Sequence, residues 1–115
     1  MAFGIDLVEI DRFARALQRW PRLRERVFAP DEDVSLTPAR LAGRFAAKEA
    51  AFKALGDGWP AIPYGDVRVV RGARGKPELE LRGTAARAAA GRIPALSITH
   101  AGGFAVAGVV LTGGG

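Results

Sequence analysis

Apolar residues recur at helical spacing near the start of the chain. This spacing predicts a helix from about Ile10 to Trp20, and Pro21 discourages its continuation. The repeating apolar positions are Ile10, Phe13, Ala14, Leu17 and Trp20. Residues 2–8 precede this helix as a short apolar run and are predicted to form a strand, in which Asp6 is the single carboxylate. The segment from Arg22 to Leu36 is ambiguous, and no element is predicted there.

A second helix is predicted between Pro38 and Leu55. Thr37 is a typical N-cap, proline suits the first helical position, and Gly56 is a typical C-terminal stop. The helix is apolar nearly all the way round, which indicates that it is buried. Its large apolar side chains form one stripe, and small residues cover much of the rest; the stripe consists of Leu41, Phe45, Phe52 and Leu55.

The C-terminal half contains two kinds of predicted strand: residues 66–71 and 78–82 alternate between apolar and polar positions, whereas 95–100 and 104–111 are apolar enough to be central or intermolecular strands. Residues 66–71 and 78–82 are predicted to pair as a hairpin around the turn 72–77, and residues 95–100 and 104–111 as a second hairpin around Ala101-Gly102-Gly103. A loop is expected over 56–64 and a short helix over 84–91. The whole pattern predicts an α+β fold in which an antiparallel sheet packs against a long buried helix, with residues 1–115 as a single domain.

Composition and charge narrow the possible functions. The chain has 115 residues, of which 49% are hydrophobic and 25% charged, as in a folded globular domain. No stretch approaches the roughly 20 apolar residues of a membrane span, and no leader pattern opens the chain, so we expect a soluble cytoplasmic protein without a membrane partner. There is no cysteine for a disulfide or a thiolate site. The net charge of +5 favours anionic partners, namely acidic proteins, phosphorylated metabolites or nucleic acid.

Lysine is rare among the basic residues. Of the 17 lysines and arginines only Lys48, Lys53 and Lys76 are lysines. A lysine kept among so many arginines suggests a site that needs a compact ammonium, as at a phosphate or a leaving group. The alternative is that these three positions carry lysine by chance and have no functional meaning.

The buried helix carries four charges that sum to +2, on Arg44, Lys48, Glu49 and Lys53. Burying them is costly unless something compensates, so an anionic group is expected nearby. Glu49 and Lys53 are four residues apart and could simply form an ion pair within the helix. Together with Asp6, however, they offer two hard oxygen ligands beside a cation, which is typical of a magnesium and phosphate site.

Two further residues are open to more than one interpretation. His100, the only histidine, follows an apolar strand and could be an ordinary strand-end residue or a substrate contact. Lys76 lies in a Gly-Lys-Pro turn that could be a plain hairpin turn or a contact for phosphate.

The first predicted helix carries a basic stripe. Arg12, Arg15 and Arg19 are expected opposite an apolar face formed by Phe13, Leu17 and Trp20. Such a stripe can be a solvated face or a docking surface for an acidic helical partner. A nucleic-acid surface would carry interleaved aromatic residues, and this face has none.

Four segments of the chain resemble the holo-[acyl-carrier-protein] synthases, the small 4'-phosphopantetheinyl transferases. The most specific is Gly43-Arg-Phe-Ala-Ala-Lys-Glu-Ala50, which is followed by Phe52-Lys-Ala54. The others are Gly4-Ile-Asp-Leu-Val-Glu-Ile10, Gly75-Lys-Pro77 and Ser97-Ile-Thr-His100. In order and spacing they extend over the whole chain.

The resemblance implies an enzyme that moves the 4'-phosphopantetheine arm of coenzyme A onto a serine of apo acyl carrier protein and releases adenosine 3',5'-bisphosphate. It implies an α+β homotrimer with active sites at the subunit boundaries, and a role in fatty acid biosynthesis. Asp6 and Glu49 would hold Mg²⁺, with Glu49 and Lys53 as the catalytic residues. The residues that would bind coenzyme A are Arg44, Lys53, Lys76, Pro77 and His100. Arg12, Arg15 and Arg19 would bind the acidic carrier protein.

The sequence differs from the family pattern at one turn, and two other functions stay open. Family members often have asparagine where this chain has Arg74, before Gly-Lys-Pro. Lys48 lies inside the signature, and the only role expected for it is to support the anionic site. A non-catalytic nucleic-acid binder would explain the pI near 10.7 but not the carboxylates and lysine. A trimeric coenzyme-A-binding module would explain the apolar strands without any chemistry.

Overall fold

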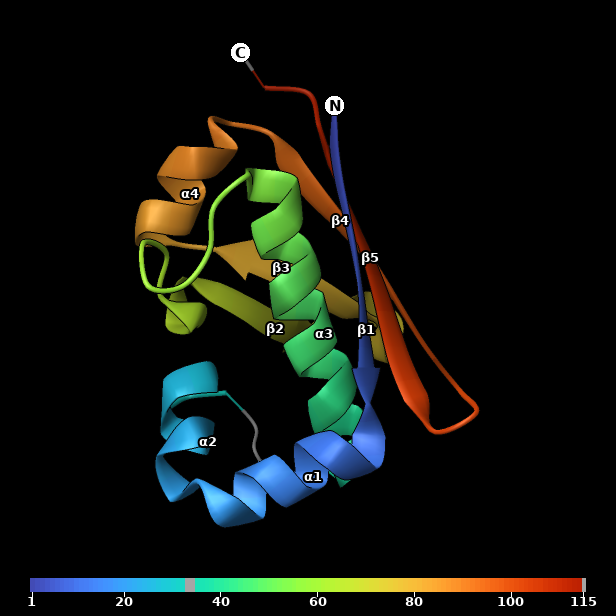
Figure 1. The fold of residues 1–115 in the computed structure, drawn as a ribbon. Coiled ribbons are helices and arrows are strands. Elements are labelled where there is room, and N and C mark those ends of the chain that lie inside the picture. Colours follow the sequence, from blue (N-terminus) through green and yellow to red (C-terminus); the bar gives the residue numbers. More distant parts are fainter. Residues whose placement is uncertain (33–34, 115) are drawn as a thin grey trace.

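The long helix α3 (Pro38–Leu55) crosses one face of a three-stranded antiparallel sheet, as Figure 1 shows for the computed structural model, which describes residues 1–32 and 35–114. The strand order is β1 (Ala2–Glu9), β5 (Phe104–Thr112) and β4 (Ile93–Ala101). In the register of this sheet Asp6 lies opposite Ala107. The predicted C-terminal hairpin is therefore confirmed, and the N-terminal strand pairs with its second strand.

The boundaries of α3 follow from local signals that the sequence carries. The Thr37 hydroxyl accepts a hydrogen bond from the backbone N–H of Arg40 at 3.3 Å, and Pro38 is the first helical residue. Gly56 ends the helix with φ +86°, a conformation that glycine adopts without steric cost. The predicted helix is confirmed at both ends.

The alanines of α3 allow it to lie directly on the sheet. Ala46, Ala47 and Ala50 are fully buried. Across from them stands Gly4 of β1, where a Cβ atom would overlap the carbonyl oxygen of Ala50. The backbones of β1 and α3 are therefore in direct contact, which fixes their separation.

Two helices lie at one end of α3, and the chain termini lie together at the other end (Figure 1). Helix α1 (Ile10–Arg19) confirms the first predicted helix, with Phe13 and Leu17 buried. The prediction that Trp20 belongs to the buried face is wrong, because its side chain is 57% exposed and packs under the Arg19 guanidinium, 5.2 Å from the ring centroid. Helix α2 (Pro21–Val27) lies in the segment for which no element was predicted.

The remaining elements form a smaller layer against α3. Strands β2 (Val67–Arg71) and β3 (Pro77–Leu81) pair as the predicted hairpin, preceded by the 3-10 turn η1 (Tyr64–Asp66) and joined by η2 (Ala73–Gly75). Helix α4 (Gly83–Ala89) then leads to β4. The antiparallel strands thus form two sheets around one buried helix, and the α+β class is confirmed.

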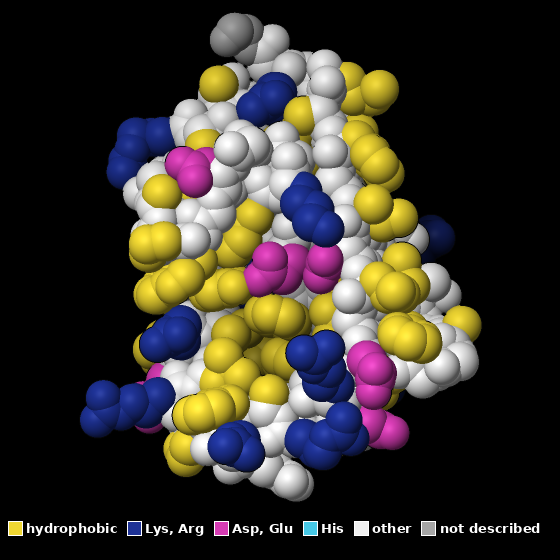
Figure 2. All heavy atoms as spheres, viewed as in Figure 1, with side chains coloured by type: hydrophobic (Ala, Val, Ile, Leu, Met, Phe, Trp, Pro, Cys, Tyr) yellow, Lys and Arg dark blue, Asp and Glu magenta, His cyan; other side chains and the backbone are white. Residues whose placement is uncertain are grey.

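The sheet has one covered and one uncovered face. Gly4, Asp6 and Val8 of β1 face α3, whereas the alternate side chains Phe3, Ile5 and Leu7 are 60%, 51% and 59% exposed. Figure 2 shows hydrophobic side chains along this edge of the molecule. Within residues 1–32 and 35–114 no helix is both long and apolar enough to cross a bilayer.

Candidate active site

Asp6 and Glu49 line one surface depression of about 480 Å³ between β1, α1 and α3. Strand β1 supplies Asp6, whose side chain is 19% exposed, and the middle of α3 supplies Glu49. Figure 2 shows acidic side chains at the centre of this face, with a basic side chain beside them and further basic side chains toward the end formed by α1 and α2. The structure therefore brings the two predicted carboxylates to one place.

Lys53 lies beside the same carboxylates, one turn of α3 beyond Glu49. Its ammonium donates to Oδ1 of Asp6 at 3.0 Å and to the carbonyl oxygen of Ile5 at 2.9 Å. The ion pair between Glu49 and Lys53 within the helix, which the spacing allowed, is not formed in the described part of the chain. Lys53 instead ties α3 to β1, and an ammonium has three N–H donors, so one is left for a ligand.

Glu49 has a partner that the sequence analysis missed. The Tyr64 hydroxyl donates to Oε1 of Glu49 at 2.5 Å, across a loop that had been assigned no role. Burial raises the pKa of Tyr64 above its ordinary range, and the hydrogen bond to Glu49 and the charge of that carboxylate add to the shift. The hydroxyl is therefore a donor at any neutral pH. The available signal in the sequence was that Tyr64 is the only tyrosine.

A second depression, of about 260 Å³, gathers most of the residues that the resemblance assigns to coenzyme A. Arg44 lines it and donates to the carbonyl oxygen of Val69 at 2.7 Å. His100 lines it as well, and its Nε2 donates to the carbonyl oxygen of Ala39 at 2.9 Å. Pro77 completes the predicted group, and the sequence analysis missed two further arginines in the wall, Arg40 and Arg71.

Lys76 stands at the rim of this second depression. Its neighbours Gly75 and Pro77 line the wall, while the Lys76 side chain is exposed and its carbonyl oxygen accepts a hydrogen bond from Gly72 at 2.7 Å. Arg74 has φ +61° and ψ +21°, the left-handed conformation that asparagine adopts more readily than arginine.

The two depressions open on different sides of α3. Arg44 and Glu49 are five residues apart, which places them about 140° apart around a helix that turns about 100° per residue. The carboxylates and Lys53 therefore belong to one face of the molecule, and Arg44, Pro77 and His100 to another. Within one copy of the chain the predicted residues therefore line separate depressions.

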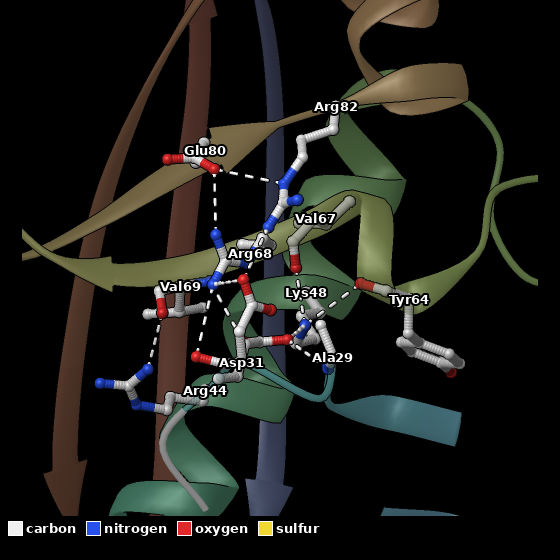
Figure 3. A network of polar contacts seen from close by, with 11 residues as sticks. Ala29, Asp31, Arg44, Lys48, Tyr64, Val67, Arg68, Val69, Glu80 and Arg82 are labelled. Carbon is white, nitrogen blue, oxygen red and sulfur yellow. Dashed lines mark hydrogen bonds and ion pairs between the residues drawn. The ribbon is translucent and has the colours of Figure 1, made fainter. Parts of the chain in front are cut away.

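Lys48 does not belong to either depression. It is fully buried, and its ammonium donates to Oε1 of Glu32 at 2.6 Å and to the carbonyl oxygens of Val67 and Tyr64 at 2.7 and 3.1 Å (Figure 3). Burial lowers the pKa of Lys48, although the charge of Glu32 acts in the opposite direction. Lys48 therefore does not bring its charge to the anionic site, because the anion that it pairs with is Glu32.

The basic stripe of α1 is exposed as predicted. Arg12, Arg15 and Arg19 all lie on the solvent side, and Arg15 makes only a long contact of 3.9 Å with the exposed Glu9. Arg12 also lines the depression that holds Asp6 and Glu49. A partner that lies on α1 would therefore reach the carboxylates directly.

The donors present at the carboxylate site fit a magnesium ion. Mg²⁺ in proteins is commonly held by one or two carboxylates, with waters and substrate phosphates as its other ligands. Asp6 and Glu49 provide two such groups, and across the described residues no cluster of three or more acidic, histidine or cysteine side chains forms a closed metal cage.

Comparison with known proteins identifies the family. The model of the 4'-phosphopantetheinyl transferase superfamily matches residues 2–107. A holo-[acyl-carrier-protein] synthase of Frankia alni is 48% identical over 111 residues, covering 93% of this chain and 92% of the relative. That of Clavibacter sepedonicus is 48% identical over 115 residues, covering 97% and 95%.

Solved structures agree with the sequence relatives. The crystal structure of Helicobacter pylori holo-[acyl-carrier-protein] synthase in complex with coenzyme A is 31% identical with a TM-score of 0.86, covering 96% of this chain and 99% of that one. The structure of the Neisseria meningitidis enzyme, at 26% identity, gives a TM-score of 0.85 over 97% and 98%. The chain therefore belongs to the 4'-phosphopantetheinyl transferase superfamily and, within it, to the holo-[acyl-carrier-protein] synthases.

Proposed function

We propose that this enzyme transfers 4'-phosphopantetheine from coenzyme A to a serine of apo acyl carrier protein, with Mg²⁺, in the cytoplasm and in the service of fatty acid biosynthesis. The observation that carries the proposal is that Asp6 and Glu49 line one depression and that the Lys53 ammonium lies 3.0 Å from Oδ1 of Asp6. It is supported by the relatives, which are synthases of this kind, and by the Helicobacter pylori structure, which contains coenzyme A.

The reaction forms a bond between the serine oxygen and the β-phosphorus of coenzyme A. The bond from that phosphorus to the bridging oxygen breaks, and adenosine 3',5'-bisphosphate departs with the bridging oxygen. Asp6 and Glu49 would hold Mg²⁺, which would supply positive charge to offset that of the phosphates. Lys53 places its ammonium where negative charge grows on the leaving phosphate. Glu49 is also the candidate for receiving the serine proton, because its carboxylate lines the same depression as Arg12 of the basic helix α1.

We infer that the second depression binds the nucleotide end of coenzyme A. Arg40, Arg44 and Arg71 line it, Lys76 stands at its rim, and His100 and Pro77 complete its wall. Several cations around a narrow depression suit the phosphates of adenosine 3',5'-bisphosphate. Because this depression and Lys53 lie on different sides of α3, we infer that another copy of the chain brings the two halves of the site together.

The assembly that we propose is a homotrimer with three active sites at its subunit boundaries. The exposed outer face of β1, with Phe3, Ile5 and Leu7, is the surface that a second copy would cover, since an apolar face of this kind marks an interface. Each site would combine the Asp6, Glu49 and Lys53 group of one subunit with the second depression of its neighbour.

The carrier protein would dock on α1. Arg12, Arg15 and Arg19 provide a positive surface for an acidic helical partner, and electrostatic complementarity acts mainly on encounter and orientation. Because Arg12 also lines the carboxylate depression, docking there would bring a serine near Glu49.

A mass-shift assay tests the proposal. The enzyme is incubated with coenzyme A, MgCl₂ and an apo acyl carrier protein, and the carrier is examined for the mass of phosphopantetheine. We expect modification that requires Mg²⁺ and that falls steeply in Asp6→Asn and Glu49→Gln. Coenzyme A binding without transfer would favour a binding module, and magnesium-dependent transfer that survives both substitutions would contradict the assignment of the carboxylates.

A further inference from the structure

Tyr64 is held at three points, and only one of them belongs to the site described above. Its carbonyl oxygen accepts a hydrogen bond from the buried ammonium of Lys48 at 3.1 Å. Its ring lies 5.0 Å from that of Phe52 and 5.8 Å from that of Trp59, centroid to centroid. Its hydroxyl donates to Glu49. The backbone, the ring and the hydroxyl of this residue therefore each have a fixed partner.

The anchor at the backbone is rigid because it is buried and multiply bonded. Figure 3 shows Lys48 at the centre of a network that joins α3, the start of β2 and the turn at Ala29. Glu32 accepts from Lys48 and from the backbone N–H of Ala29 through Oε1, and from the N–H of Val69 at 3.4 Å through Oε2. Lys48 in turn reaches Tyr64, so the loop that carries the tyrosine is fixed to the core.

The hydroxyl controls what Glu49 presents to the depression. A glutamate has three rotatable bonds and rotates readily when it is only partly buried, whereas a ligand for a cation must be held in place. The hydrogen bond takes Oε1, and within the described residues Oε2 has no protein partner. The short bond to a carboxylate is of the strong, charge-assisted kind. The carboxylate is thereby held with one oxygen engaged and the other available.

We propose that Tyr64 is a positioning residue that orients Glu49, so that Oε2 is the oxygen presented to the divalent cation and the pyrophosphate. The inference rests on the proposed function, because it assigns Glu49 to the cation. It adds that the orientation of this carboxylate is set by a loop residue outside α3, since Lys48 fixes the backbone of Tyr64 and the Tyr64 hydroxyl holds Glu49. Removal of a group that orients a metal ligand in this way commonly lowers the metal affinity by roughly 10- to 100-fold.

Tyr64→Phe is the informative variant. It keeps the ring that packs on Phe52 and Trp59 and removes only the hydroxyl. Calorimetric titration of coenzyme A at a series of MgCl₂ concentrations, without carrier protein, gives the concentration of Mg²⁺ at which half of the metal-dependent gain in affinity is reached. We expect this concentration to rise about tenfold in Tyr64→Phe, while coenzyme A binding in EDTA is unchanged. Excess Mg²⁺ should restore most of the affinity.

The control separates orientation from general loosening of the loop. Ile62→Val removes one buried methylene equivalent two residues before Tyr64 and leaves the hydroxyl bond intact. It should lower the melting temperature by at least as much as Tyr64→Phe does, with no change in the magnesium requirement. An unchanged magnesium requirement in Tyr64→Phe overturns the inference alone. If coenzyme A binding to the unsubstituted enzyme does not respond to Mg²⁺, the proposed function itself fails, and the inference fails with it.

Discussion

The ammonium of Lys53 lies 3.0 Å from Oδ1 of Asp6, although the two residues are 47 positions apart in the chain. This pair joins α3 to β1 at the edge of the carboxylate depression. Because the Lys53 side chain is 57% exposed, the ion pair contributes little to the stability of the fold. Its importance is that it keeps the Lys53 ammonium beside the carboxylate of Asp6.

Substitution of Lys53 should therefore affect turnover and leave the fold intact. In both Lys53→Met and Lys53→Arg we expect kcat for phosphopantetheine transfer to fall by about a hundredfold, because the ammonium that we propose to meet the leaving phosphate is lost or replaced by a planar guanidinium. Thermal unfolding should change little, since an exposed ion pair contributes only about 0–1 kcal/mol. Full activity in Lys53→Arg would show that any cation suffices there.

Lys48 should behave in the opposite way. Lys48→Met leaves the buried carboxylate of Glu32 without its partner, and we expect a loss of about 3–5 kcal/mol in the free energy of unfolding, measured by urea titration. The double variant Lys48→Met with Glu32→Leu should recover most of this loss, because no unpaired charge remains. Lys76→Met, at an exposed position, is the matched control and should unfold as the unsubstituted chain does. Equal stability of the two single variants would refute the structural role.

Tyr64 should resist ionisation in the folded protein. It is the only tyrosine, so the ultraviolet absorbance of phenolate reports on it alone. Its pKa is raised in the folded state, hence the stabilisation is fully present below the ordinary value of 10.0 and is lost as the pH rises toward the folded pKa. Above that ordinary value the unsubstituted chain should lose stability with pH more steeply than Tyr64→Phe. Phenolate that forms in the native state with an ordinary midpoint would contradict this.

Replacing Arg74, whose backbone is in the left-handed conformation, with asparagine should raise the free energy of unfolding. A non-glycine residue in the left-handed conformation costs roughly 1–2 kcal/mol, and asparagine tolerates it better than most. Arg74→Asn should therefore raise the free energy of unfolding by about 0.5–1 kcal/mol. Arg74→Ala, which removes the same guanidinium without easing the backbone, should give no such gain. If alanine stabilises equally, charge and not conformation is responsible.

Charge reversal on α1 tests the docking surface. In Arg12→Glu with Arg15→Glu, repulsion of an acidic carrier should raise its KM by roughly tenfold, with the KM for coenzyme A unchanged. Arg87→Glu on α4, on another part of the surface, is the control for net charge. An equal rise in both Michaelis constants would argue against docking on α1.

Much of the fold could be predicted because its signals are local. Thr37, Pro38 and Gly56 define the ends of α3 without reference to any other segment, and the apolar run of residues 104–111 is visible within eight positions. Helix α2 escaped prediction because seven residues are too few for a clear period and because Pro21 was interpreted only as the end of α1. The same proline is also the first residue of α2.

The parts of the site that could not be predicted depend on contacts distant in sequence. Asp6, Glu49 and Lys53 carry chemistry that is visible in their residue types and in the resemblance to a family. The partner of Lys48 is Glu32, which lies 16 residues earlier in the segment for which no element was predicted. Helical spacing within α3 therefore could not identify this partner. The Tyr64 hydroxyl reaches Glu49 through the path of a loop, which no periodicity records.

The close contact between Gly4 and Ala50 has a consequence for how this enzyme can be altered. Asp6 stands two residues beyond Gly4, and Glu49 is the neighbour of Ala50, so the spacing of the two carboxylates is set by main chain against main chain. If these carboxylates bind a metal ion as we propose, smaller side chains at this contact would not make room for a larger ion, because main chain meets main chain there. The size of the site would instead depend on the length of the two acids, and exchanging aspartate and glutamate would change it.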